Sequence, residues 1–132
     1  MLLIVFAGRS GSGKTTIIRR LTEKLTERGL KIGCIKHCPH GFDMDHKGKD
    51  SYNFMESGAE GIIVSSQNRV GIIRKEDNFN LKEIAIDNFM DFDFVFAEGF
   101  HNQEGVKKVE LLRSKVSIEE EIEDSIAIFS DT

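Results

Sequence analysis

The chain has 132 residues, of which 39% are hydrophobic and 30% are charged, and its formal net charge is −4 at pH 7. This size and composition predict a single soluble domain over residues 1–132 with its own hydrophobic core. The negative charge and the lack of a basic stripe exclude a general nucleic-acid binder, and no apolar run is long enough to cross a membrane.

The chain opens with an apolar run at residues 2–7, which has the length of a buried strand and lacks the basic start and cleavage site of a leader peptide. Gly8–Thr15 follows and reads G-x-x-x-x-G-K-T, the phosphate-binding loop of nucleotide-binding proteins. Apolar residues at helical spacing after the loop predict a helix that begins near Lys14 and ends before Gly29.

A strand, a glycine-rich turn and a helix form the arrangement that phosphate binding needs. The glycines allow successive backbone N–H groups to converge on one oxyanion, and the start of the helix adds unpaired N–H groups and a positive dipole end. Lys14 can reach terminal phosphates, and the Thr15 hydroxyl can bind Mg²⁺. The predicted phosphate-binding residues are Gly8, Ser10, Gly11, Ser12, Gly13, Lys14, Thr15 and Thr16.

A second strand is predicted at residues 31–37, which completes a βαβ unit with two parallel strands. Lys36 and His37 end this strand, at the edge of an α/β sheet where ligands gather. Lys36 can neutralise phosphate charge, and His37 can donate to a phosphate or approach a metal. The alternative is that both side chains are simply solvated.

The loop after this strand is rich in potential ligands. Its Cys and His residues are of the kind that bind zinc, but their spacing matches no closed zinc site. Asp43 and Asp45 are hard oxygen donors that suit Mg²⁺ or a polar ligand. Lys49 and Asp50 belong to a segment that can receive an anionic group at the start of a short helix, which we expect Asp50 to cap.

Residues 61–74 predict an antiparallel hairpin beside the parallel strands, with its turn at residues 66–68. Its apolar residues on an exposed edge invite pairing with a second chain, so we expect the hairpin to contribute to a homodimer. The remaining elements are predicted as a helix at 80–88, strands at 92–98, 107–113 and 126–129, and a short acidic helix that opens at a capping box of Ser117 and Glu120. The fold class is therefore α/β, a three-layer sandwich like the P-loop NTPases.

Glu98 ends the predicted strand 92–98 and is the candidate acidic partner of the phosphate loop, binding Mg²⁺ together with Thr15. The N–H group of Gly99, which follows it, is expected to face a terminal phosphate. Asp93, at the opposite end of the strand, is expected to be solvated. The chain lacks an Asn-Lys-x-Asp segment for guanine, and Asp131, just past the last strand, is the candidate that reads the base.

Seven segments together carry a more specific signal than the phosphate loop alone. They are Gly8–Thr15, Ile35–His37, Asp43–Asp45, Gly48–Tyr52, Ser57–Ala59, Val95–Phe100 and Ile126–Asp131. Their order resembles that of the MobB family, the molybdopterin-guanine dinucleotide biosynthesis adapter proteins, over nearly the whole chain.

This resemblance implies a cytoplasmic, homodimeric protein that binds GTP and Mg²⁺ and hydrolyses GTP feebly at most. It implies a partnership with the MobA-type guanylyltransferase that joins GMP to molybdopterin, and molybdopterin as a possible ligand in the cleft near Lys36, His37, Asp43 and Asp45. Many relatives continue well beyond the segment that ends here at Asp131.

Two other functions compete with this interpretation. A small metabolite kinase would use Asp43 or Asp45 as the base that activates its acceptor, although no arginine-rich lid is visible. A nucleotide-gated metallochaperone would carry its metal on Cys38, His40 and His46.

Overall fold

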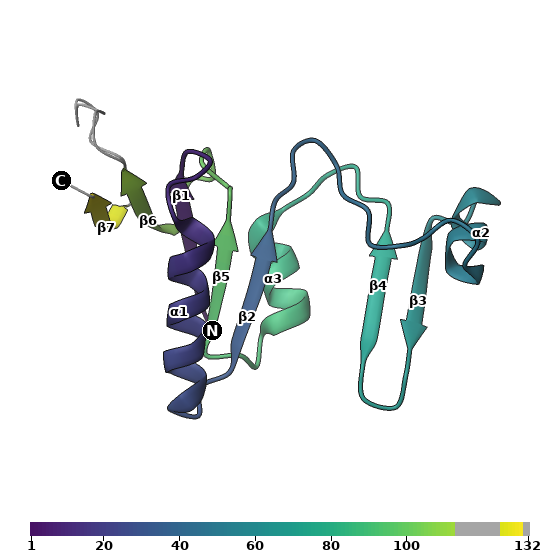
Figure 1. Cartoon of the computed structure of the whole chain (residues 1–132), viewed down its shortest axis with the longest axis horizontal. Helices are drawn as coiled ribbons and strands as arrows, with labels where there is room; N and C mark the ends of the chain where they lie inside the picture. The colour runs from purple at the N-terminus through teal and green to yellow at the C-terminus, as the bar shows by residue number, and fades with distance from the viewer. Residues whose placement is uncertain (113–124, 131–132) are drawn as a thin grey trace. The chain divides into compact units, whose positions relative to one another are not determined.

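The computed structural model describes residues 1–112 and 125–130, and the chain divides into two compact units. The first unit combines Met1–Cys38 with Leu81–Thr132, and the second is Pro39–Asn80 (Figure 1). Our expectation of one domain over residues 1–132 included no such division. Each unit is therefore described by itself.

The first unit contains a sheet of five parallel strands in the order β2-β5-β1-β6-β7. The strands are β1 (Leu2–Gly8), β2 (Ile32–Lys36), β5 (Phe94–Glu98), β6 (Lys107–Leu112) and β7 (Ser125–Ser130). Strand β1 lies at the centre, so that β5 and β6 cover both of its edges. The carboxyl ends of these parallel strands lie along one edge of the sheet.

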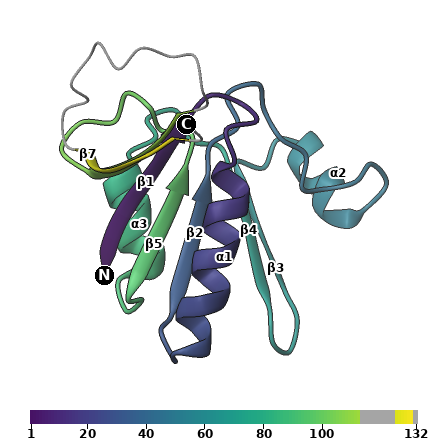
Figure 2. The same ribbon diagram turned by 60° about the vertical axis from the view of Figure 1, so that its left-hand side comes forward.

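Helices cover both faces of this sheet, because its inner strands are apolar on both sides. Helix α1 (Lys14–Glu27) packs Ile17, Ile18 and Leu21 against a cluster that contains Phe6 and Phe96. Helix α3 (Leu81–Phe89) adds Leu81 to the cluster on the opposite face (Figure 2). The predicted three-layer α/β fold with a mostly parallel sheet is thus confirmed.

The start of β2 is held by charged groups that the sequence did not single out. Asp93 is exposed, as expected, and its carboxylate also accepts a hydrogen bond from the backbone N–H of Lys31 at 2.7 Å. The Lys31 ammonium lies 4.2 Å from the centre of the Phe92 ring and hydrogen-bonds Asp91, which lowers the pKa of the Asp91 carboxyl. These contacts hold the residue before β2 against the residues before β5.

The second unit contains helix α2 (Asp50–Glu56) and a hairpin of β3 (Gly61–Ser65) and β4 (Val70–Arg74). The hairpin forms a two-stranded sheet of its own and does not extend the parallel sheet. Lys49, without a side-chain hydrogen bond, occupies the N-cap position of α2, so the predicted cap by Asp50 was wrong. Asp50 is instead the acidic residue of the first turn, where its negative charge interacts favourably with the positive end of the helix dipole.

The helix predicted to open at Ser117 lies outside the described residues, as does Arg113 at the end of the predicted strand 107–113. In the part of the chain that the structure describes, no helix is both long and apolar enough to cross a membrane.

The packing of β2 against α3 can be tested by a substitution at Gly33. A Cβ atom at Gly33 would lie 2.8 Å from Cδ1 of Phe89, whereas one at Gly71 would have no atom within 4 Å. We expect Gly33→Ala to destabilise the protein by about 1–3 kcal/mol through overpacking, and Gly71→Ala to be neutral or slightly stabilising. Urea unfolding of both variants measures the difference, and equal midpoints would contradict the packing described here.

Candidate functional site

The loop that joins β1 to α1 has a backbone that only glycine can supply at its two ends. Gly8 has a φ of +147°, and a Cβ there would lie 2.6 Å from the Leu111 carbonyl oxygen and 2.7 Å from Ser12 Oγ. Gly13 adopts a left-handed conformation with φ +94° at the N-cap of α1. The glycines therefore let the loop pass close to β6 and then turn into the helix.

The start of α1 is well suited to an anion. No side chain caps the helix, so its first N–H groups remain available to a ligand. The Ser12 N–H donates to the Arg9 carbonyl at 3.1 Å, which closes the turn of the loop. Ser12 Oγ is buried and has no hydrogen-bond partner among the described residues. A buried hydroxyl of this kind fits a loop that is built around a polar ligand.

Lys14 lies across this loop, with its ammonium group held by two backbone carbonyls. It donates to Gly8 O at 2.7 Å and to Arg9 O at 2.9 Å. Both partners are neutral carbonyl oxygens, whereas a phosphate oxygen carries charge and forms a stronger hydrogen bond with an ammonium. The side chain is therefore placed at the loop and can exchange its partners for an anionic ligand.

Thr15 and Glu98 meet although 83 positions separate them in the sequence. The Thr15 hydroxyl lies 3.2 Å from Glu98 Oε1 and 3.4 Å from Oε2. The β1–β5 register sets Glu98 opposite Phe6, two residues before the loop, which delivers the carboxylate to this place. A hydroxyl and a carboxylate are hard oxygen ligands, so the pair fits Mg²⁺.

These groups line one cavity of about 430 Å³ in the first unit. Its lining residues are Ser10, Gly11, Gly13, Lys14, Thr15, Thr16, Lys36 and Glu98. Six predicted loop residues thus come together with Lys36 and Glu98. Lys36 reaches the cavity because β2 pairs with β5 in a register that sets Lys36 opposite Glu98.

Two predicted residues lie beside this cavity without lining it. The His37 N–H donates to the Glu98 carbonyl at 3.0 Å, and its ring packs against Phe100, with centroids 5.2 Å apart. The Gly99 N–H donates to Phe6 O at 3.3 Å, so the sheet already uses the group that we expected to face a phosphate. Phe100 was not predicted as a site residue, although it follows Glu98-Gly99 directly.

Other predicted residues belong to the second unit, so the cleft that they were expected to share with the phosphate loop stays a prediction. Asp45 Oδ1 accepts hydrogen bonds from the His46 N–H at 2.8 Å and from Ser51 Oγ at 3.0 Å. Asp45 Oδ2 is buried without a partner among the described residues. Asp43 is also in this unit, and Asp131 lies outside the described residues.

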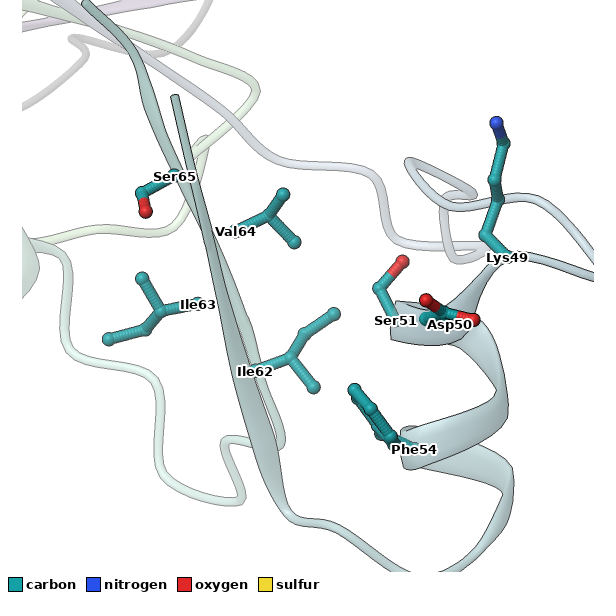
Figure 3. A pocket seen from close by; sticks show the side chains of 8 residues that line it. All are labelled: Lys49, Asp50, Ser51, Phe54, Ile62, Ile63, Val64 and Ser65. Carbon is teal, nitrogen blue, oxygen red and sulfur yellow. The ribbon is translucent and has the colours of Figure 1, made fainter. Parts of the chain in front are cut away.

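Lys49 and Asp50 line a separate cavity of about 420 Å³ between α2 and β3 (Figure 3). Its wall is mostly apolar, formed by Phe54 and by residues of β3. Across residues 1–112 and 125–130, no group of three or more His, Cys, Asp and Glu side chains could hold a metal ion. The metallochaperone alternative therefore gains no support from a preformed cluster.

Comparison with known proteins identifies the family. Residues 3–131 match the profile of MobB, described as molybdopterin guanine dinucleotide synthesis protein B. The chain is 38% identical over 117 residues to the molybdopterin-guanine dinucleotide biosynthesis adapter protein of Escherichia coli (strain K12), covering 84% of this chain and 65% of that protein. It is 31% identical over 121 residues to the protein of the same name from Haemophilus influenzae, covering 87% and 65%.

The fold agrees with this match. The crystal structure of Bacillus subtilis MobB has a TM-score of 0.80 at 30% identity, covering 100% of this chain and 81% of that chain. A structure of molybdopterin-guanine biosynthesis protein B has a TM-score of 0.66, also at 30% identity, covering 83% and 67%. The chain belongs to the MobB family. It spans about two thirds of the length of the curated relatives that it matches, 65% in both cases above.

The position of Lys14 predicts a variant that loses phosphate binding without unfolding. Lys14→Ala removes two hydrogen bonds to loop carbonyls, so we expect a stability change of only about 1 kcal/mol and loss of measurable nucleoside triphosphate binding. Calorimetric titration and thermal melting check both parts. Lys24→Ala, which removes the same charge from the last turn of α1, is the control. Nucleotide affinity that survives Lys14→Ala would contradict the assignment of this site.

Proposed function

We propose that this protein binds GTP with Mg²⁺ at the loop between β1 and α1 and acts as an adapter in molybdopterin-guanine dinucleotide biosynthesis. The observation that carries the proposal is the single cavity that joins the loop, the Lys14 side chain and the Thr15–Glu98 pair. A glycine-rich turn that only connects a strand to a helix does not require a carboxylate from a distant strand beside the first turn of the helix.

Each group has a distinct task in this proposal. The backbone N–H groups of Gly11 and Gly13 and the start of α1 hold phosphate oxygens. Lys14 exchanges its carbonyl partners for phosphate oxygens and neutralises part of their charge. Thr15 and Glu98 would hold Mg²⁺, which supplies charge neutralisation to the terminal phosphates when it is bound.

The cavity favours holding the nucleotide over hydrolysing it. Fast hydrolysis of a nucleoside triphosphate needs a residue that orients the attacking water and usually an arginine that stabilises the transition state. Among the residues that the structure describes, those that line the cavity include no Gln, His or Arg. We therefore propose supply or delivery of GTP, with hydrolysis weak at most.

The names of the relatives support a partner enzyme in the same biosynthesis. Relatives with 38% and 31% identity carry the name molybdopterin-guanine dinucleotide biosynthesis adapter protein. We infer that this chain serves the cytoplasmic, MobA-type guanylyltransferase that joins GMP to molybdopterin, and that molybdopterin is a ligand of Lys36 and His37 in the first unit.

Titration with different nucleotides tests the proposal. We expect GTP to bind more tightly than ATP, and Mg²⁺ to tighten GTP binding because the Thr15–Glu98 pair needs a cation when phosphate approaches the carboxylate. Calorimetry with GTP, ATP and GDP, each with and without Mg²⁺, measures both effects.

Each other outcome of this titration has a defined meaning. A preference for ATP would contradict the GTP assignment and favour the alternative function of a small metabolite kinase. Binding that depends on phosphate but not on the base would mean that the chain holds the phosphates without reading the base, which would contradict the GTP assignment and keep the phosphate site. Failure of every nucleotide to bind would refute the proposal as a whole.

A homodimer through the hairpin is the second part of the proposal, because both faces of the hairpin carry apolar side chains. Ile62 and Val64 point toward Phe54 of α2, while Ile63 points to the other side of β3 (Figure 3). On that other side, Ile63 is 71% exposed, and Ile72, which pairs with it across the hairpin, is 56% exposed. An apolar face of this kind supports coverage by a second chain.

Sedimentation at micromolar concentration tests the dimer. We expect the unmodified protein to sediment as a dimer and Ile63→Lys to shift it toward the monomer, because a charge would be buried in the apolar interface. Gln67→Lys, which adds the same charge in the turn of the hairpin, should leave the dimer intact. A strictly monomeric unmodified protein would contradict the idea.

A further inference from the structure

Lys36 is a second lysine in the phosphate cavity, and it reaches the cavity from a different side than Lys14. It is the last residue of β2, which lies at the edge of the parallel sheet and pairs only with β5. The strand registers place Lys36, Glu98 and Phe6 side by side across β2, β5 and β1. Glu98 therefore stands between Lys36 and the strand that enters the loop.

The alternation of side chains along a strand directs Lys36 to the face of the sheet that α1 covers. Ile32, four residues earlier on β2, packs against the cluster beneath α1, and so does Phe96, two residues before Glu98. Lys36 and Glu98 consequently point to the same side as the first turn of α1, which carries Thr15. The cavity collects all three side chains.

The two lysines differ in what their ammonium groups contact. Lys14 is bonded to two carbonyls of the loop itself. Within the residues that the structure describes, no hydrogen bond or ion pair engages the Lys36 ammonium, and the residue is exposed. The Lys36 ammonium can therefore bind an anionic ligand without breaking a hydrogen bond or ion pair within the described part of the protein.

The position of Lys36 relative to Glu98 indicates which phosphate it would meet. The inner phosphates of a nucleotide lie against the loop amides and the start of α1. Thr15 and Glu98 would hold the Mg²⁺ that neutralises the charge of the terminal phosphates, so the outermost phosphate is expected on the Glu98 side of the cavity. Strands in a sheet are about 4.8 Å apart, and Lys36 is one strand beyond Glu98 on that side.

We propose that Lys36 makes this site discriminate nucleoside triphosphates from diphosphates by binding the terminal phosphate. This inference rests on the proposed function, because it assumes that the loop binds a nucleotide with Mg²⁺. The Glu98 carboxylate repels the charge of a third phosphate, and the Lys36 ammonium beside it offsets this repulsion. A diphosphate has no group in that position, so Lys36 contributes little to its binding.

The experiment measures the ratio of the dissociation constants of GDP and of a non-hydrolysable GTP analogue, both with Mg²⁺, by calorimetry. One charge-assisted hydrogen bond corresponds to a change of about tenfold or more. We expect Lys36→Ala to weaken the triphosphate by about that factor, to weaken GDP less than about threefold, and so to lower the ratio by about three- to tenfold. Lys36→Arg should retain most of the ratio, and Lys24→Ala should leave it unchanged.

The outcomes separate this inference from the function on which it rests. An equal loss of GDP and triphosphate affinity in Lys36→Ala would overturn the inference while leaving the phosphate site in place, and so would an unchanged ratio. Lys14→Ala should weaken both nucleotides, which distinguishes the two lysines. If the unmodified protein binds no nucleotide, both the proposed function and the inference fail. If it prefers adenine, the same ratio is measured with ADP and an ATP analogue.

Discussion

The pairing of β1 with two parallel neighbours is the constraint on which the site depends. Val5, Phe6 and Ala7 are at most 1% exposed, and β5 and β6 bond to both edges of their strand. Parallel strands end at the same edge of a sheet, so the loop after β1 and the carboxylate at the end of β5 must come together there. The Thr15–Glu98 contact is a result of this pairing.

The same pairing explains the balance of charge at the site. One carboxylate, that of Glu98, lines the same cavity as two lysines that come from different elements, Lys14 from the start of α1 and Lys36 from the end of β2. An anionic ligand gains from both ammonium groups, and a divalent cation would offset the carboxylate. In the function proposed above, Lys14 holds the inner phosphates and Lys36 binds the outermost one, so the two tasks fall to different elements of the fold.

The features that depend on local sequence could be predicted, and those that depend on register could not. The positions of the loop, α1 and β2 could be predicted from glycine placement and apolar spacing. Glu98 could be chosen as a candidate site residue because it ends an apolar strand and precedes a glycine. The Gly99 N–H was assigned to a ligand, but its carbonyl partner on β1 depends on how β5 and β1 align. Asp93 is exposed as expected, but its hydrogen bond with the Lys31 N–H was not predicted, because that partner is 62 positions away. The separate sheet of the hairpin is likewise a property of the assembled fold.

The order of the strands has a consequence for how the chain folds. The central strand precedes the other strands of the sheet in the chain, and its partners come late, because Ile4 pairs with Phe96 on one side and with Lys107 on the other. Contacts of such high sequence separation slow folding. During synthesis, the apolar strand β1 therefore leaves the ribosome long before β5 and β6, and its edges stay without their strand partners until then.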